Sequence, residues 1–399
     1  MIATIEKLET ETVVSVNKTF HYKLKPTKNQ EIIFGQWLGT CRYLYNVSLE
    51  YRKYLYAQKG VNISKFDLIN EIPEVKKTEG FEWIKQVPAN TLQAVIERLD
   101  NSYQRFFKLG AGFPKFAQKN KYKSFLLKNN SSGSEIKVSG NRFKLPKIGH
   151  VKFFNSRPVE SKIKTATIRK EADGWYISVT FVGNVEALPL LDNNVGLDLG
   201  VKYFAVTSDG EYIDNPRHYN KYQDELRILQ RSLDRKKKGG NNRNKASIKL
   251  DKIHQKIANT RKDFLNKVST KLISENQSVV VEDLRIKNLT KKSKPKLSDD
   301  GKTYLKNNRK QKAGLSKSIL DAGWGMFCNM LDYKSKWFGR WFVKVPAQYT
   351  SRDCSNCNFR TEEMPLTIRE WQCPQCNSFH NRDENASKNI LKKWLEDQN

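Results

Sequence analysis

The sequence Val195-Gly196-Leu197-Asp198-Leu199-Gly200-Val201 is apolar except for a single carboxylate, Asp198. A lone carboxylate inside an apolar strand is costly to bury unless it is paired or binds a cation. The strand pattern continues through Tyr203-Phe204-Ala205-Val206-Thr207 into Ser208-Asp209-Gly210, which predicts a hairpin turn. We therefore expect a new structural unit to begin near Asn194, with Asp198 as a candidate functional residue.

Two further carboxylates stand at the ends of predicted elements. Glu282 ends the run Ser278-Val279-Val280-Val281, and Asp383 lies in Arg382-Asp383-Glu384-Asn385-Ala386, where a helix is expected to start. Each acid also has a structural explanation: Asp198 as a turn residue, Glu282 as a charge at a strand edge, and Asp383 as a helix N-cap. Together they predict a carboxylate triad from two strand ends and one helix start. Carboxylates suit paired Mg²⁺ ions, which can support phosphodiester hydrolysis.

Four of the six cysteines fall in one short window. Cys354-x2-Cys357 and Cys373-x2-Cys376 are separated by fifteen residues. Two such pairs can present four thiolates tetrahedrally, which predicts a zinc site that is structural because no coordination position stays open. The alternative is two unrelated cysteine pairs. Cys41 and Cys328 lie on apolar helix faces, and we expect them to be core thiols.

The charge of the chain favours a polyanionic partner. There are 72 Lys and Arg against 42 Asp and Glu, a net charge of +30. Neutralising phosphates with such side chains releases counterions, so nucleic acid is the expected partner. No apolar run is long enough for a membrane span, the N-terminus lacks a secretory signal, and the clustered cysteines suit a reducing compartment.

The N-terminal half divides into a helical pattern and a β pattern. Apolar residues recur every three or four positions over 33–55 and over 92–106, which predicts two amphipathic helices. Alternating stretches follow within 111–187, and Asp173-Gly174 between two of them predicts a hairpin. We expect this β part to form a small barrel joined by a strand near 19–25.

The C-terminal half adds more helices around the apolar strands. Residues 221–275 predict two basic helices joined at Gly239-Gly240-Asn241-Asn242. Residues 285–312 hold eleven Lys and Arg against two Asp, which predicts a mobile loop. One helix is expected through 319–331, and a final helix near Asn385.

Four motifs, taken in order, resemble those of one family. They are Gly196-Leu197-Asp198-Leu199-Gly200-Val201, Val281-Glu282-Asp283-Leu284, the two Cys-x2-Cys pairs, and Arg382-Asp383-Glu384-Asn385-Ala386. This set resembles the TnpB family, which insertion sequences encode and which resembles the ancestors of type V CRISPR effectors. Further segments similar to the family lie at 25–30, 41–46, 113–116, 321–324 and 349–351. The chain departs from the pattern at Asn358, near which members usually have glycine, and at Asn381, where an acidic residue is common.

The resemblance implies a mixed fold class: α/β with β-barrel and helical units, including an RNase H-like (RuvC) nuclease domain with an inserted four-cysteine zinc ribbon. The implied parts are an N-terminal tail (1–18), a wedge domain resembling a β-barrel (19–28 and 111–193), a helical recognition domain (29–110), a RuvC-like nuclease domain (194–350 and 379–399) and a zinc ribbon that binds target nucleic acid (351–378).

By resemblance, Asp198, Glu282 and Asp383 would be the catalytic residues and would hold two Mg²⁺, with Mn²⁺ as an alternative metal. The four cysteines would hold one structural Zn²⁺. The implied function is RNA-guided cleavage of double-stranded DNA beside a short flanking motif, by two-metal phosphodiester hydrolysis. The implied partners are a guide RNA from the element's end and the target DNA, with no membrane. We expect a monomer on one guide RNA in the prokaryotic cytoplasm.

Two alternatives to guided cleavage remain open. The first is a catalytically silent, RNA-guided DNA-binding regulator, which the loss of one carboxylate would mark, although all three are present. The second is a guide-free nuclease or transposase of RNase H fold, which would lack a bound guide RNA. Neither a P-loop nor a Gly-x-Ser-x-Gly motif occurs in the chain.

Overall fold

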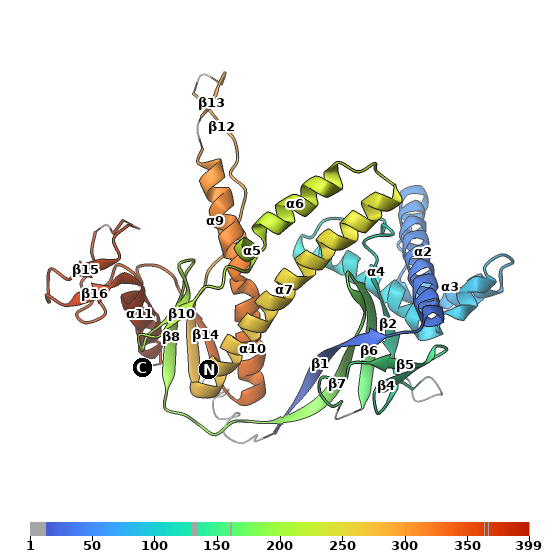
Figure 1. Cartoon of the computed structure of the whole chain (residues 1–399), viewed down its shortest axis with the longest axis horizontal. Coiled ribbons are helices and arrows are strands. Elements are labelled where there is room, and N and C mark those ends of the chain that lie inside the picture. The colour runs from blue at the N-terminus through green and yellow to red at the C-terminus, as the bar shows by residue number, and fades with distance from the viewer. Residues whose placement is uncertain are drawn as a thin grey trace. The chain divides into compact units, whose positions relative to one another are not determined.

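The computed structural model of the chain describes residues 13–129, 135–159, 162–299, 301–305, 307–362, 364–365 and 367–398. They form two compact units, one of residues 15–184 and one made mainly of the described residues from 185 onward (Figure 1). The expected N-terminal tail lies mostly outside the described residues. Its last residues belong to strand β1, which starts at Val13.

The first unit is built on a seven-stranded sheet with the order β2-β6-β7-β1-β5-β4-β3. Its strands are β1 (Val13–Lys25), β2 (Ser124–Lys128), β3 (Lys137–Ser139), β4 (Arg142–Leu145), β5 (Gly149–Phe153), β6 (Ile163–Glu171) and β7 (Gly174–Glu186). The hairpin predicted at Asp173-Gly174 is confirmed, because it joins β6 to β7. The strand predicted near 19–25 is also confirmed as part of β1, where Leu24 pairs with Phe153 of β5.

Within the described ranges this sheet does not close into the expected barrel, because β2 and β3 each have only one neighbouring strand. The β2 edge is covered by helix α4 (Ala89–Leu109) instead. Asn90 Nδ2 donates to the Lys128 carbonyl at 2.7 Å, and Arg98 Nη1 donates to the Ser124 carbonyl at 3.0 Å. These side chains satisfy edge carbonyls that another strand would pair with. An alternating sequence pattern predicts strands, but it does not show whether an edge strand is covered by a helix or pairs with another strand to close a barrel.

The helices of the first unit are α2 (Lys28–Lys59), α3 (Lys65–Lys77), the short 3₁₀ helix η1 (Glu82–Gln86) and α4. The helices predicted over 33–55 and 92–106 are confirmed as parts of α2 and α4. Phe34 and Trp37 of α2 pack against Phe125 of β2, with ring centroids 6.1 and 5.5 Å apart. The helices and the sheet therefore share one hydrophobic core.

The second unit contains a five-stranded sheet with the order β10-β9-β8-β11-β14. Its strands are β8 (Asn194–Leu199), β9 (Tyr203–Thr207), β10 (Tyr212–Asp214), β11 (Ser278–Glu282) and β14 (Trp341–Val345). Strand β11 runs parallel to both β8 and β14, whereas β9 is antiparallel to β8 and β10. The hairpin predicted at Ser208-Asp209-Gly210 is confirmed as the turn between β9 and β10.

Helices cover both faces of this sheet. On one face, α7 (Asn241–Glu275) and α10 (Trp324–Phe338) share a core with Val195, Leu197 and Leu199 of β8. On the other face, α11 (Arg382–Glu396) packs through Ile390 against Val280. Side chains alternate between the faces of a strand, so the even-numbered positions of β8 and β11 face α11.

The remaining elements are α5 (His218–Lys221), α6 (Gln223–Asp234), α8 (Ile286–Leu289), α9 (Arg309–Ala322) and the short strands β12 (Lys296–Leu297), β13 (Tyr304–Leu305), β15 (Glu370–Gln372) and β16 (Phe379–Asn381). The predicted pair of helices joined at Gly239-Gly240 is confirmed as α6 and α7. No helix in the described part of the chain is long and apolar enough to cross a membrane.

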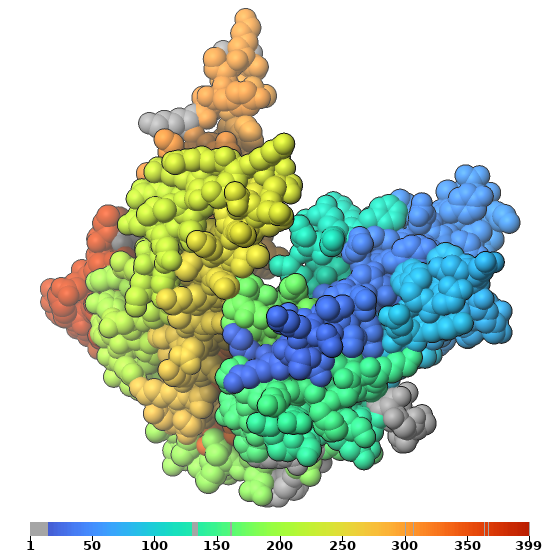
Figure 2. Space-filling model, turned by 45° about the vertical axis from the view of Figure 1, so that its right-hand side comes forward, coloured from blue at the N-terminus to red at the C-terminus, as the bar shows by residue number. Residues whose placement is uncertain are grey.

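Two expectations for the second unit were wrong. The basic segment 285–312 was expected to be a loop, but it contains α8, the β12–β13 hairpin and the start of α9; Figures 1 and 2 show this hairpin projecting from the unit. The single helix expected through 319–331 is two helices that break at Gly323. Gly323 has a φ of +76°, and a Cβ there would lie 3.1 Å from Leu265 Cδ1, so the break suits a glycine.

Gly196 lets α11 lie directly on β8. A Cβ at this position would lie 2.2 Å from the Ser387 carbonyl oxygen and 2.8 Å from the Leu391 nitrogen, both backbone atoms of α11. We expect Gly196→Ala to push α11 off the sheet and to lower the free energy of unfolding by about 3 kcal/mol. Thermal denaturation measures this. The control is Gly314→Ala, whose glycine has open space around it and no left-handed backbone conformation; equal losses in both variants would contradict the close-approach argument.

Candidate active site and cysteine cluster

The three carboxylates predicted to act together come from β8, β11 and α11. Asp198 lies on the α11 face of β8, and Glu282 is the last residue of β11. The parallel register pairs Val281 with Leu197, so Glu282 comes beside Asp198 on the same face. Asp383 is the second residue of α11, the helix that covers this face. The structure therefore brings the three residues to one end of the sheet.

The helix start that carries Asp383 is capped by its neighbour. Asn381 is the N-cap of α11, and its Oδ1 accepts hydrogen bonds from the backbone N–H groups of Asp383 and Glu384 at 3.0 and 3.5 Å. Asp383 was considered as an N-cap in the sequence, but that role belongs to Asn381. The Asp383 side chain instead forms an ion pair at 3.2 Å with Arg369, which lies just before β15 (Glu370–Gln372).

The electrostatics of the site show that the three acids interact. Burial of Asp198, together with the negative charges of Glu282 and Asp383, raises the pKa of Asp198 to about 7. Burial also raises the pKa of Glu282, although a hydrogen bond from Thr350 opposes this effect. A carboxyl group close to two other acids loses its proton more easily when a cation is bound, because the cation offsets the neighbouring negative charges. This pattern suits a divalent cation site.

Thr350 connects Glu282 to the cysteine segment. Its Oγ1 donates to Glu282 Oε1 at 2.5 Å, and its carbonyl accepts a hydrogen bond from Asn389 Nδ2 at 2.8 Å. Asn389 also donates to the Asp353 carbonyl at 2.6 Å, and Asn385 donates to the same carbonyl at 2.7 Å. Thr350, Asn385 and Asn389 are all buried. The helix that carries Asp383 thus holds the segment whose threonine orients Glu282.

If the site cleaves phosphodiester bonds as the sequence predicts, Thr350→Val should lower the single-turnover rate about 10- to 100-fold, the usual cost of removing a hydrogen bond that orients a metal-ligating side chain. Valine keeps the shape of the side chain but cannot donate to Glu282. The matched variant Thr350→Ser keeps the hydroxyl and should restore most of the activity. Single-turnover cleavage rates measure the effect. Equal losses in the valine and serine variants would show that Thr350 contributes packing alone.

The four predicted cysteine ligands lie together. The sulfur atoms of Cys354, Cys357, Cys373 and Cys376 are all within 4.8 Å of one another, and they are the one cluster of this kind among the described residues. Two sulfur pairs, 354 with 376 and 357 with 373, are 3.6 Å apart. A tetrahedron with Zn–S bonds of about 2.3 Å has edges of about 3.8 Å, so this donor set fits zinc, whereas disulfide sulfurs would be about 2 Å apart. His380 Nε2 lies 3.0 Å from the Cys354 sulfur.

Two asparagines give the cysteine loops their turns. Asn358 and Asn377 follow the second cysteine of each pair, with φ angles of +64° and +58°. This left-handed conformation favours glycine, and asparagine is among the few other residues that adopt it readily. The departure of the sequence at Asn358 is therefore compatible with the same turn.

The other two cysteines lie outside the cluster, as predicted. Cys41 is fully buried in the core of the first unit, where burial raises the pKa of its thiol to about 12. Cys328 is a residue of α10 and packs against the core of the second unit.

Several residues of the site were not found by sequence reasoning. Thr350 and Asn385 lay in segments recognised as similar to the TnpB family, but no role could be read from their positions. Arg369 and His380 carried no signal, since neither has a ligand spacing. Their contacts depend on how the cysteine loops return to the sheet.

Comparisons with known proteins agree with these features. The family model OrfB_IS605, described as "Probable transposase", matches residues 177–293. A second model, described as "Cas12f1-like, TNB domain", matches residues 324–390 and includes the four cysteines. A helix-turn-helix domain model matches residues 15–60, where the structure has strand β1 and the single long helix α2.

Several whole proteins are similar over nearly the full chain. "Putative RNA-guided DNA endonuclease InsQ" of Escherichia coli K12 is 32% identical over 94% of this chain and 91% of its own length. A similarly described protein of Streptomyces pristinaespiralis is 30% identical over 95% and 90%. TnpB-like protein L79 of Acanthamoeba polyphaga mimivirus is 23% identical over 94% and 72%.

The fold is also similar to a solved structure. The protein in the cryo-EM structure of a Cas12f1–sgRNA–target DNA complex matches with a TM-score of 0.59 at 13% identity, covering 94% of this chain and 99% of that one. At this identity the likeness shows the mixed α/β fold. The motifs, the cysteine cluster and the full-length similarity to InsQ together show that this chain belongs to the TnpB (OrfB_IS605) family.

Proposed function

We propose that this protein is an RNA-guided DNA endonuclease that hydrolyses phosphodiester bonds at the Asp198–Glu282–Asp383 site. The observation that carries the proposal is the meeting of these three carboxylates at one end of the sheet, in a chain of the TnpB family. The names of its relatives, and the complex in which the similar fold was solved, support a guide RNA and target DNA as partners. The net charge of +30 suits both polyanions.

The three carboxylates would hold two Mg²⁺ ions, or Mn²⁺ in their place. Bound divalent ions would supply an activated water and stabilise the charge that develops on the departing oxygen. The residues of this chain position the groups around them. Thr350 orients Glu282, the N-cap at Asn381 fixes the start of the helix that carries Asp383, and Arg369 faces Asp383 as a cation beside the reacting phosphate.

The four cysteines would hold one structural Zn²⁺. All four positions around such an ion are protein sulfurs, so it would not take part in hydrolysis. Its proposed task is to hold the segment of Thr350 and Asp353 against α11. In the family's terms, residues 351–378 would be the zinc ribbon, and residues 194–350 with 379–399 the RuvC-like nuclease domain of RNase H fold.

The first unit, together with residues 185–193 of the second, would supply the remaining domains. Residues 29–110 would form the recognition domain, and residues 19–28 with 111–193 the wedge domain. Base pairing with the guide would read the target, while the protein would read the short flanking motif. We also propose that one protein chain acts on one guide RNA.

The experiment that tests the proposal is sequencing of the RNA that co-purifies when the protein is expressed beside its native flanking DNA. A discrete RNA with a constant part and a 3′ end running into flanking sequence is expected. Changing that end should redirect Mg²⁺-dependent cleavage to a matching DNA. Heterogeneous RNA that salt removes, with cleavage that ignores the guide, would instead support a guide-free nuclease. Guided binding without cleavage would support a silent regulator.

A further inference from the structure

A basic pocket lies in the second unit, apart from the carboxylate site. Its volume is about 550 Å³, and it is formed by α5, α7, the segment after α8, and α9. Glu282 lines a different and smaller cavity of about 250 Å³, which has no residue in common with this pocket. The pocket is within the size range of sites that enclose one small-molecule group. We refer to it as the α9 pocket.

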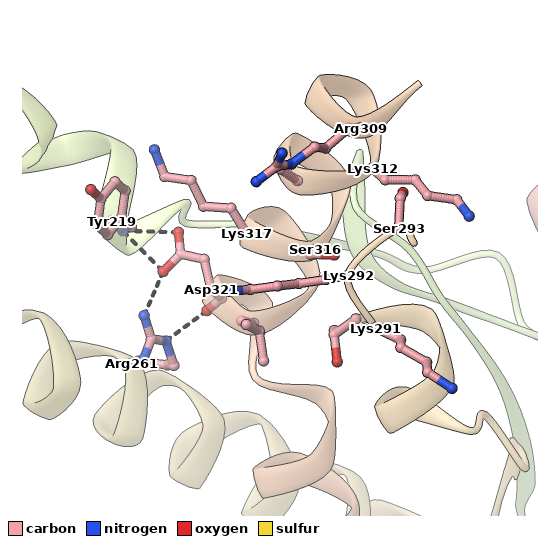
Figure 3. A pocket seen from close by; sticks show the side chains of 13 residues that line it. Tyr219, Arg261, Lys291, Lys292, Ser293, Arg309, Lys312, Ser316, Lys317 and Asp321 are labelled. Atoms are coloured by element: carbon pink, nitrogen blue, oxygen red, sulfur yellow. Dashed lines mark hydrogen bonds and ion pairs between the residues drawn. The ribbon is translucent and has the colours of Figure 1, made fainter. Parts of the chain in front are cut away.

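The floor of the α9 pocket is a closed ion pair. Arg261 Nη2 donates to Asp321 Oδ1 at 2.6 Å, and Arg261 Nε donates to the Asp321 carbonyl at the same distance. The backbone N–H of Tyr219 also donates to both oxygens of the Asp321 carboxylate, at 3.0 and 2.8 Å. Figure 3 shows these contacts as the dashed lines between the three residues. The one acid of the pocket is therefore fully engaged.

The rim of the α9 pocket carries cations without acidic partners. Lys291, Lys292, Arg309 and Lys312 are exposed, and within the described residues none of their side chains has an ion pair or hydrogen bond. Figure 3 shows Lys292 and Lys317 beside the Arg261–Asp321 pair, with Arg309, Lys312 and Lys291 farther from it. Four unpaired cations around one opening repel each other, and an anion between them would relieve that repulsion.

Two further features indicate what kind of anion fits. Ser293 lines the pocket, and its Oγ is buried without a hydrogen-bond partner among the described residues, so it would reach a phosphate oxygen after a side-chain rotation. Tyr219 and Leu320 add an aromatic and an apolar surface, and Lys317 Nζ lies 4.0 Å from the centre of the Tyr219 ring. Cations and a hydroxyl suit phosphate oxygens, whereas the apolar surface suits a sugar or base.

We propose that the α9 pocket binds the sugar–phosphate backbone of a nucleic-acid strand, with one nucleotide seated over the Arg261–Asp321 floor. The rim cations come from two separate segments, so they can contact successive phosphates rather than one isolated ion. Duplex DNA is too wide to enter a cavity of this volume, so the occupant is a single strand. This proposal rests on the proposed function, because the strand would be part of the guide RNA or of the target DNA.

The test compares two triple variants of the full-length protein. The pocket variant is Lys291→Gln, Lys292→Gln and Lys312→Gln. The control variant is Lys245→Gln, Lys249→Gln and Lys252→Gln, three exposed lysines of α7 that do not line the pocket, so both variants lose the same charge. Circular dichroism confirms that both are folded. The probes are fluorescein-labelled oligouridylate RNA and oligothymidylate DNA of equal length, measured by anisotropy in EDTA at about 50 to 200 mM salt.

We expect the pocket variant to bind strands about tenfold more weakly, and the slope of log affinity against log salt to fall by about two, because each single-strand phosphate contact contributes about 0.7. The control should change affinity by less than about threefold.

A loss for RNA alone, for DNA alone or for both supports the pocket proposal and identifies the strand. A loss no larger than that of the control overturns it. Competition by inorganic phosphate with unchanged strand binding also overturns it, in favour of a small-anion site.

The result is independent of guided cleavage, because binding is measured without divalent cations. If the wild-type protein fails to cleave with a guide while the pocket variant still loses strand binding, the proposed function fails and the pocket proposal stands. If guided cleavage succeeds while both triple variants bind equally, the proposed function stands and the pocket proposal fails.

Discussion

Asp198→Asn is expected to abolish guided DNA cleavage, with a loss of about a thousandfold or more in the cleavage rate. Asparagine keeps the shape of the side chain but removes the charge that a pair of divalent cations needs. Metal stabilisation of the transition state is worth several kcal/mol, and each 1.36 kcal/mol corresponds to a factor of ten. The measurement is single-turnover cleavage of a guide-matched DNA. Binding of guide and target should change little, because the pocket and the charged surfaces remain.

The control for this prediction is Asp192→Asn, which removes an exposed carboxylate from the segment before β8. Its cleavage rate should stay within about twofold of the wild-type rate. Normal cutting by Asp198→Asn would show that Asp198 is not catalytic. A loss of guide binding equal to the loss of cleavage would show that the residue acts on folding or assembly.

The same substitution has a second expected effect, on stability. Asp198 has a folded-state pKa of about 7 against an ordinary value of 3.8. The fold therefore favours the protonated acid, so the contribution of Asp198 to stability is largest at low pH and is lost as pH rises from about 4 to about 7. In EDTA at about pH 8, Asp198→Asn should be more stable than the wild type by up to about 4 kcal/mol. A variant that is less stable than the wild type there would contradict the electrostatic reading of the site.

Cys373→Ser is expected to remove the bound zinc and to unfold the cysteine segment. Cys373 is fully buried, and its sulfur is one of the four that meet. A lost metal site belongs to the small class of changes that cost about 4 kcal/mol or more. Metal analysis should fall from about one zinc per chain to nearly none. Limited proteolysis should then cut within 351–378. Cleavage should also be lost, because Thr350 and Asp353 would no longer be held against α11.

Cys328→Ser is the matched control, since it replaces a half-buried thiol outside the cluster. It should keep its zinc. Cys328 also lines the cavity of Glu282, so zinc content, and not cleavage, is the readout of this control. Full zinc content in Cys373→Ser would disprove the four-cysteine site. Loss of zinc with unchanged cleavage would support the four-cysteine zinc site. It would disprove the proposed link between the cysteine segment and Glu282.

Much of the site could be predicted because its residues are unusual for the sequence around them. Asp198 interrupts an apolar strand, Glu282 ends a β-branched run, and the cysteine pairs have a spacing that suits metal binding. Such signals are local and depend only on residue type and period. The role of Gly196 could not be read in this way, since its Cβ position conflicts with α11, which begins nearly 190 residues later.

The sequence by itself determined most of the longer strands, the helices α2, α4, α6, α7 and α11, the clustered cysteines, the excess charge and which three acids to suspect. Only the tertiary structure decided that the first sheet stays open beneath α4, that α9 and α10 break at Gly323, and that Thr350 reaches Glu282. It also placed Lys291, Lys292 and Lys312 around one pocket. The physical reason is the distance along the chain over which each signal acts. Periodicity and spacing report interactions within a few residues, whereas a covered sheet edge, a hydrogen bond between distant segments or a pocket forms where remote parts of the chain meet.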